Sequence, residues 1–146
     1  MRVRLEEDLS QAELEVLIRY SHFNQTVQKL KTLIASVDRT IACSFKGHQL
    51  RINASDIYYI ESVDKRSFIY GENTVYESPL RLYQLLEELS DVGFVQVSKS
   101  CIVNINVLVC IKPLLNSRLE ATLRNGECIY VTRKYVPIIR KKLERW

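Results

Sequence analysis

From residue 40 onward the chain is a series of short runs with β-type alternation, each closed by a turn, and this pattern most limits the fold. The runs are residues 41–45, 50–52, 57–63, 67–71, 74–77, 94–97, 101–104, 118–123 and 127–131. The last two are joined by Asn125-Gly126, a dipeptide typical of tight β-hairpins. Short alternating runs at this spacing predict a mainly β domain of antiparallel strands over residues 40–146, with short helices.

Two segments of this domain have helical spacing instead. Ser78-Pro79 predicts a helix start, because Ser caps helices and Pro suits their first position. The apolar positions that continue this helix toward Gly93 are Leu80, Tyr83, Leu86 and Leu89. Thr132 is expected to cap a short basic helix near the C-terminal end, although Pro137 would interrupt that helix or delay its start.

Residues 1–37 have a different pattern. Residues 13–20 alternate, which predicts a half-buried strand, and residues 24–36 have the spacing of an amphipathic helix capped by Asn24. We therefore expect a small N-terminal β-β-α unit, too short to bury its own apolar face. It either caps the β domain of a monomer, or forms a homodimer through strand 13–20 and helix 24–36, since an unpaired strand edge is a template for its symmetry mate.

Charge is distributed unevenly along the chain. Residues 94–146 hold ten Lys or Arg against three Glu, a net charge of +7, whereas residues 1–93 hold eleven basic and fourteen acidic residues, a net charge of −3. A basic C-terminal half favours a polyanionic partner. No apolar run is long enough to cross a membrane, and the first residues lack the apolar core of a secretion signal, so a cytoplasmic protein is expected.

The sequence offers no recognisable catalytic set. Four glycines in the whole chain leave no Gly-rich loop for a phosphate. The two histidines, His22 and His48, are not spaced from the cysteines as metal ligands usually are. The cysteines, Cys43, Cys101, Cys110 and Cys128, form no Cys-x-x-Cys pair and lie in apolar runs. Glu61 and Asp64 are the nearest to an acid–base pair, but Asp64 precedes two cations in a turn. We expect no enzyme activity, no metal and no cofactor.

The segment 94–104 combines two apolar runs with a polar interruption, Ser98-Lys99-Ser100. The interruption places a cation between two hydroxyls where the chain must bend. Such a bend suits a phosphate backbone or a base edge, because hydroxyls position the ligand while the cation neutralises or reads it.

Four blocks together resemble the LytTR-type DNA-binding domain of bacterial transcriptional regulators. The blocks are Asp56-Ile57-Tyr58-Tyr59-Ile60-Glu61, the helix ending near Leu89, Phe94-Val95-Gln96-Val97-Ser98-Lys99-Ser100-Cys101-Ile102-Val103-Asn104, and Val131-Thr132-Arg133-Lys134-Tyr135. Their order and spacing match over roughly residues 40–146. Because the 37 preceding residues are too few for a receiver domain, the chain resembles the stand-alone regulators of this family, whose genes often accompany a small membrane protein that restrains them.

The resemblance implies an elongated antiparallel β domain that binds double-stranded DNA through loops, which enter successive major grooves. Carried over by motif position, the base-reading candidates are Lys65, Arg66, Ser67, Lys99 and Arg133. The phosphate-binding candidates are Ser98, Ser100, Lys134 and Tyr135. Many members carry His where Ser98 stands, so Ser98 is expected to contact only the DNA backbone.

Other residues of the motif have structural interpretations. Asp56 and Asn104 are expected to form turns or caps. The expected core positions are Tyr58, Ile60, Phe94, Val97, Ile102 and Val103. Arg140, Lys141 and Lys142 are either phosphate contacts or a solvated helix face, and the sequence leaves both open.

Two other functions compete with sequence-specific transcriptional regulation. The first is a protein-interaction module, in which residues 13–20 and 24–36 bind a membrane-tethered regulatory partner and DNA contact is secondary. The second is a redox sensor that uses Cys101 and Cys110, which requires exposed thiols of lowered pKa.

Overall fold

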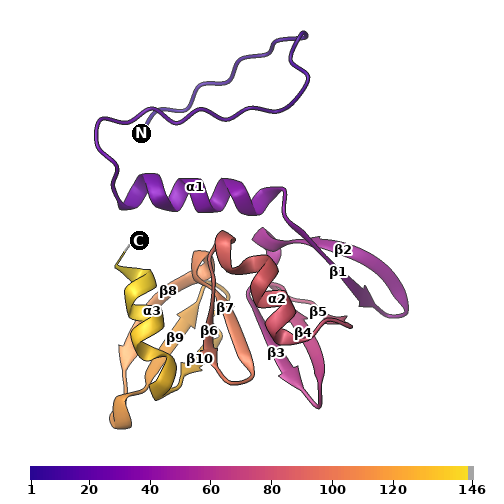
Figure 1. The fold of residues 1–146 in the computed structure, drawn as a ribbon, viewed down its shortest axis with the longest axis vertical. Coiled ribbons are helices and arrows are strands. Elements are labelled where there is room, and N and C mark those ends of the chain that lie inside the picture. Colours follow the sequence, from indigo (N-terminus) through magenta and orange to yellow (C-terminus); the bar gives the residue numbers. More distant parts are fainter. Residues whose placement is uncertain (145–146) are drawn as a thin grey trace.

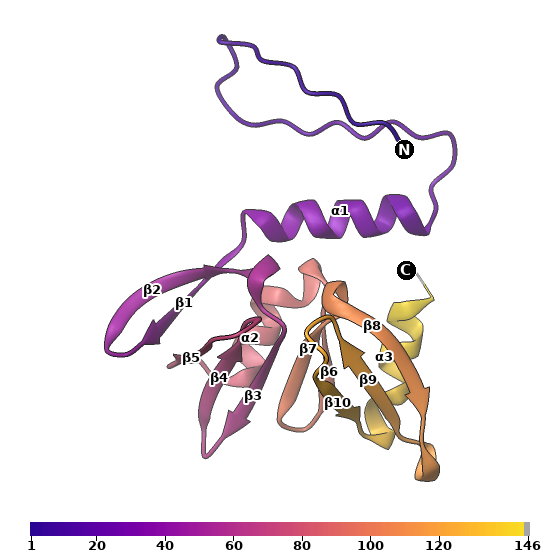
Figure 2. The ribbon, with the colours of Figure 1, turned by 180° about the vertical axis from the view of Figure 1, so that it is seen from behind.

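The computed structural model describes residues 1–144 and places residues 40–144 mainly in two antiparallel sheets (Figures 1 and 2). The larger sheet has seven strands in the order β2-β1-β5-β4-β3-β7-β6, and the smaller has three in the order β10-β9-β8. The strands are β1 (Thr40–Phe45), β2 (His48–Asn53), β3 (Tyr59–Val63), β4 (Arg66–Tyr70), β5 (Val75–Ser78), β6 (Phe94–Ser98), β7 (Cys101–Asn104), β8 (Leu108–Pro113), β9 (Leu119–Leu123) and β10 (Cys128–Val131). The prediction of a mainly antiparallel β fold is confirmed.

Three α-helices accompany the sheets: α1 (Gln25–Val37), α2 (Leu82–Leu89) and α3 (Val136–Leu143). Figure 1 shows α1 lying across one end of the β domain, above both sheets, with α2 against the larger sheet and α3 beside the smaller one. The turns β3–β4, β6–β7 and β8–β9 lie at the opposite end, away from α1. The two ends of the domain therefore have different surfaces.

Two cores meet at the central strands. One, beside α2, includes Ile41, Ile60, Ile69, Leu85, Leu89, Phe94 and Ile102. The other, between the sheets and α3, includes Tyr59, Val97, Val103, Leu119, Leu123 and Ile139. Because successive side chains of a strand point to opposite faces, β3 and β7 contribute alternate residues to both cores. The central part of the larger sheet is thus buried on both sides and rigid.

The expected core positions of the motif are confirmed. Tyr58, Ile60, Phe94, Val97, Ile102 and Val103 all lie in the interior, with at most 6% of each side chain exposed. Asn104 has the structural role expected: its Nδ2 donates to the Ile57 carbonyl at 2.8 Å, and its Oδ1 accepts from the Asn106 amide at 2.9 Å. A fully buried amide with both ends bonded fixes the chain after β7.

The N-terminal prediction is correct for the helix, whereas the expected strand is not formed within the single chain. Helix α1 begins after Asn24, whose side chain accepts from the Val27 amide as an N-cap should. Residues 13–20, however, are exposed apart from Ile18 and belong to neither sheet, so no strand of the described chain bonds their backbone groups. The sequence pattern was β-like, but the partner it needs is absent from the single chain.

Two boundaries in the main domain also differ from expectation. Ser78 does not start a helix, because it still pairs with Ser67 in the β4–β5 ladder, and α2 begins only after Arg81. Thr132 begins a 3-10 turn over Arg133–Tyr135, and α3 follows with Pro137 in its first turn, where Pro is tolerated. The proline therefore delays the start of the helix rather than interrupting it.

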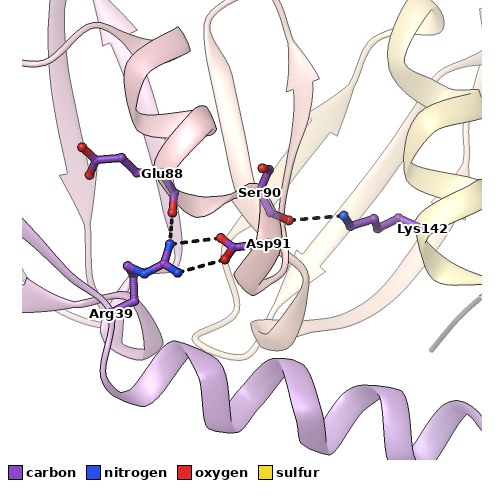
Figure 3. Close-up of polar contacts among 5 residues, drawn as sticks. All are labelled: Arg39, Glu88, Ser90, Asp91 and Lys142. Carbon is purple, nitrogen blue, oxygen red and sulfur yellow. Dashed lines mark hydrogen bonds and ion pairs between the residues drawn. The ribbon is translucent and has the colours of Figure 1, made fainter.

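Polar contacts fasten α1 to the domain (Figure 3). The Arg39 guanidinium, just after α1, donates to both carboxylate oxygens of Asp91 at 2.9 and 3.0 Å and to the Glu88 carbonyl. At the other end of α1, Gln25 Nε2 donates to the Glu144 carbonyl at 3.0 Å. The Arg39 contact lowers the pKa of the Asp91 carboxyl, since the neighbouring cation stabilises its charged form.

Candidate nucleic-acid interface

The β6–β7 turn presents Lys99 and Ser100 to solvent. The register between β6 and β7 shifts between Gln96 and Ser98, so the strand carries an irregularity immediately before the turn. The Ser98 hydroxyl accepts from the Ser100 amide at 3.3 Å. Bulged strand ends are a common way to direct a side chain outward, and here they expose the Lys99 side chain.

The β3–β4 turn is built from two non-glycine residues in left-handed conformation, Asp64 (φ 50°) and Lys65 (φ 65°). Two positive φ values are what a two-residue hairpin needs to match the twist of its strands, and Asp tolerates them better than most residues. Lys65 and Arg66 are exposed, and the Arg66 guanidinium lies 3.9 Å from Glu77, at the outer limit of an ion pair.

One expected base-reading residue is excluded by its position. Ser67 is only 1% exposed, and its hydroxyl donates to the Leu80 carbonyl at 2.7 Å. It faces the interior because it follows the exposed Arg66 in a strand, where successive side chains alternate between faces. The prediction of Ser67 as a DNA contact is therefore corrected: its hydroxyl ties β4 to the segment before α2.

The third segment follows β10. Arg133 and Lys134 are exposed in the 3-10 turn, and Lys134 Nζ lies 5.6 Å from the centre of the Tyr135 ring, within the range of a cation–π contact. Tyr135 is partly buried. The Lys134 ammonium is thus held over the Tyr135 ring at this point of the surface.

Backbone hydrogen bonds join these three segments. The Ser62 amide, in β3, donates to the Ser100 carbonyl at 2.8 Å, and the Thr132 amide donates to the Val97 carbonyl at 2.9 Å. We call residues 64–66, 98–100 and 132–135 together the loop edge, which lies at the end opposite α1 (Figure 1). Its cations come from three places in the sequence and lie on one rigid surface.

The cations of the loop edge are largely unneutralised. Within residues 1–144, Lys65, Lys99, Arg133 and Lys134 take part in no ion pair, and Arg66 has only the long contact with Glu77. An ammonium or guanidinium without a carboxylate partner is available to an anionic ligand.

Sequence reasoning missed further residues beside the loop edge. A groove of about 470 Å³ runs along α2, and its lining includes Arg81, Tyr83, Gln96 and Lys99. Tyr83 has the spacing of the apolar helix positions but is 64% exposed. Because α2 starts three residues later than expected, its inward face is set by Leu85 and Leu89, and the helical spacing alone could not distinguish this register.

Arg118 also lies next to the loop edge. Val131 pairs with Leu119, so the exposed Arg118 side chain is close to the start of the 132–135 segment. The β8–β9 turn before it contains two more left-handed residues, Asn116 and Ser117. Sequence reasoning missed Arg118 because its positive charge was the only signal, and charge alone does not show where a residue lies in the fold.

The basic residues of α3 are not part of the loop edge. They lie in the last turn of the helix, toward α1, and the Lys142 ammonium donates to the Ser90 carbonyl at 3.4 Å (Figure 3). Lys142 therefore links α3 to the segment after α2. The sequence left open a phosphate contact or a solvated helix face for this cluster, and the bond of Lys142 within the protein is neither.

The cysteines give little support to a redox sensor. Cys101 is buried, and burial raises the pKa of its thiol to about 12, so the reactive thiolate is scarce near neutral pH. Cys110 is exposed, but it lies on β8 in the smaller sheet, whereas Cys101 lies on β7 in the larger one.

Comparison with known proteins agrees with this geometry. A family model of the LytTr DNA-binding domain matches residues 47–144. The chain belongs to the LytTR family. The LytTR match includes every segment of the loop edge, and it leaves out residues 1–46, which contain the N-terminal segment and α1.

Individual relatives are distant. The sensory transduction protein LytT of Bacillus cereus is 27% identical over 135 residues, covering 89% of this chain and 55% of that protein, so the chain spans about half the length of this relative. An uncharacterized HTH-type transcriptional regulator of Staphylococcus aureus is 24% identical over 145 residues, covering 98% of both chains. In residues 1–144, however, no two α-helices follow each other directly.

A solved structure shows the same fold. It is the LytTr DNA-binding domain of a putative methyl-accepting/DNA response regulator from Bacillus cereus. The TM-score is 0.68 at 24% identity, and the match covers 73% of this chain and 97% of that one.

No described helix of our chain is long and apolar enough to cross a membrane.

Proposed function

We propose that this protein is a transcriptional regulator that binds double-stranded DNA sequence-specifically through the loop edge. The observation that carries the proposal is the meeting of three exposed basic segments on one surface, held together by the Ser62–Ser100 and Val97–Thr132 backbone hydrogen bonds. Membership of the LytTR family supports the same ligand.

The side chains of the loop edge fall into two groups, those suited to reading bases and those suited to binding phosphates. Lys65, Arg66, Lys99 and Arg133 project from turns and suit guanine O6 and N7 in the major groove, since Arg and Lys make the commonest specific base contacts. Ser98, Ser100, Lys134 and Tyr135 suit phosphate oxygens, which fix the position of the protein without reading sequence. Arg118 and Arg81 flank the edge and would extend the phosphate contacts.

The arrangement also suits contact with more than one groove. The three segments follow one another along the edge instead of converging on one point, so neighbouring turns would enter successive major grooves on one face of the duplex. The phosphates between those grooves would then lie against the hydroxyl-bearing positions. In this proposal the rigid sheets, not a recognition helix, set the spacing between contacts.

Selection of binding sites from a random DNA pool tests this proposal. The selected duplex should bind roughly 10³-fold or more tightly than a scrambled duplex at the same salt concentration. The logarithm of the affinity should fall with the logarithm of salt concentration by roughly 0.9 per neutralised phosphate. No enriched sequence, or an affinity independent of salt, contradicts the proposal.

A second candidate function is binding of a membrane-tethered regulatory protein, with DNA contact secondary. The observation in its favour is the exposed apolar segment before α1, which includes Leu14 and Leu17. If this function were primary, substitutions in the loop edge would leave the cellular effect of the protein unchanged. Reporter transcription with Lys99→Ala and Arg133→Ala variants distinguishes the two functions.

A further inference from the structure

Residues 1–24, which we call the N-terminal arm, expose an unusual amount of apolar surface. The large apolar side chains that are at least 54% exposed are Met1, Val3, Leu5, Leu9, Leu14, Val16, Leu17, Tyr20 and Phe23. Figures 1 and 2 show the arm on the far side of α1 from the sheets. Soluble monomers rarely expose so many apolar side chains together, and such patches mark interaction surfaces.

The arm turns back on itself as a β-hairpin does, but no ladder of backbone hydrogen bonds joins its two halves. Its chain reverses at Asp8, whose carbonyl accepts from the Gln11 amide at 3.0 Å and whose carboxylate accepts from the Ser10 amide and hydroxyl. The two legs then run back along each other (Figure 1). In the described chain neither leg is paired as a strand, so their backbone groups are free to bond another strand.

Helix α1 also leaves apolar surface uncovered. The positions it buries are Val27, Thr32 and Ser36, of which two are polar. Leu30, Leu33 and Ile34 are only partly buried. An amphipathic helix usually turns its apolar stripe to the core, so this stripe indicates that a second apolar layer covers α1 in the assembled protein.

We infer that residues 13–21 pair antiparallel with the same residues of a second copy of this chain, around a two-fold axis at Leu17. In this register residue i faces residue 34 − i of the partner copy. Val16 then faces Ile18, and Leu14 faces Tyr20, on one apolar face that covers the α1 stripes. A two-fold interface requires a surface complementary to itself, and this sequence has that property.

The charges of the segment obey the same symmetry. Glu15 faces Arg19 of the second copy, and Arg19 faces its Glu15, so two opposite-charge pairs flank the central Leu17. Opposite charges placed directly across antiparallel strands stabilise the pairing, and like charges there destabilise it. This complementarity favours a second copy over an unrelated protein as the occupant. The inference does not depend on DNA binding.

Charge reversal in the full-length chain tests the register. The wild-type protein should sediment as a dimer, while Glu15→Arg and Arg19→Glu should each shift it to a monomer by setting like charges opposite each other. The double variant should recover the dimer. Glu13→Arg makes the same charge change opposite an uncharged Ser21, so it should leave the dimer largely intact. Circular dichroism should show every variant folded, because all three positions are exposed.

Disulfide trapping tests the axis itself. Residues facing each other across antiparallel strands have Cα atoms about 4.5–5.5 Å apart, within the range of a disulfide. In a Cys110→Ser, Cys128→Ser background, which removes the exposed thiols, Leu17→Cys should give a covalent dimer on mild oxidation. Leu14→Cys, whose partner in this register is Tyr20, should not.

Each outcome decides the inference. A monomeric wild-type chain overturns it and leaves the arm to a different partner. Single reversals that stay dimeric, a double variant that stays monomeric, or equal trapping at positions 14 and 17 overturn the proposed register. Rescue by the double variant together with selective trapping at Leu17 supports it.

Discussion

Lys99 in the loop edge and Leu17 in the N-terminal arm are both exposed, but the backbone around them is held in different ways. The turn that carries Lys99 lies between two buried strands and is bonded to its neighbour through Ser62 and Ser100. In the described chain, the backbone of residues 1–23 makes hydrogen bonds only in the turn at Asp8. One surface is formed by the folding of a single chain, and the other, in our proposal, is completed by a second molecule.

This difference has a functional meaning. A rigid edge suits a DNA ligand of fixed shape, because the chain need not pay ordering entropy when it binds. An arm with few contacts of its own would gain its order from the association that we propose, and its pairing would then depend on protein concentration. Substitutions should therefore separate folding, DNA binding and association.

The largest expected effect concerns folding. Phe94→Ala should lower the free energy of unfolding by about 3–5 kcal/mol, because Phe94 is 1% exposed and its removal leaves a cavity between β6 and α2. Leu14→Ala, at 88% exposure, should change it by less than about 0.5 kcal/mol. Denaturant unfolding at protein concentrations where the chain is monomeric measures both. Equal effects would mean that the arm belongs to the core.

The next effect concerns base reading. Lys99→Ala and Arg133→Ala should each weaken binding to the selected duplex by about 1–3 kcal/mol and relax the preference at one base position. Titration of duplexes with single base changes measures this, and Lys134→Ala serves as the control that should weaken all sequences alike. If all three variants behave like the control, these residues contact phosphates only.

A smaller effect concerns the attachment of α1. Arg39→Ala should lower the free energy of unfolding near neutral pH by roughly 1 kcal/mol or less, since Arg39 and Asp91 form an exposed ion pair. The pKa of the Asp91 carboxyl is lowered in the folded state, so this stabilisation is present above its ordinary value of 3.8 and is lost as the pH falls through the lowered pKa. The difference in unfolding free energy between the two proteins should therefore shrink in acid, because the ion pair is lost while the bond from Arg39 to the Glu88 carbonyl remains. A constant difference at all pH values contradicts this assignment.

The local pattern of apolar residues and turns predicted most of the strands of the β domain. The alternation of the short runs gave the strands of both sheets except β8, and Asn125-Gly126 gave the β9–β10 hairpin, where Gly126 has a φ of 89°. These features depend on neighbouring residues, so the sequence shows them directly. Strand β8 has no clean alternation, and its pairing with β9 is a tertiary contact.

The errors arose where a residue's environment comes from distant segments. Ser67 looked like a surface residue of a turn, but its position in the β4–β5 ladder turns its hydroxyl inward to Leu80. Tyr83 had helical spacing, yet the register of α2 exposes it. Residues 13–20 had strand alternation without a strand partner. In each case the deciding contact lies far along the chain or, as we propose for the arm, in a second molecule.

Hydrogen exchange on the full-length protein, with and without the selected duplex, tests the central claim most directly. If the loop edge binds DNA, amides near Lys65, Ser100 and Arg133 should exchange more slowly in the complex, because bound DNA shields them from solvent. Amides of residues 1–24 should exchange at the same rate at constant protein concentration and oligomeric state. Protection confined to the arm or to the last turn of α3, with none in the loop edge, would contradict the account.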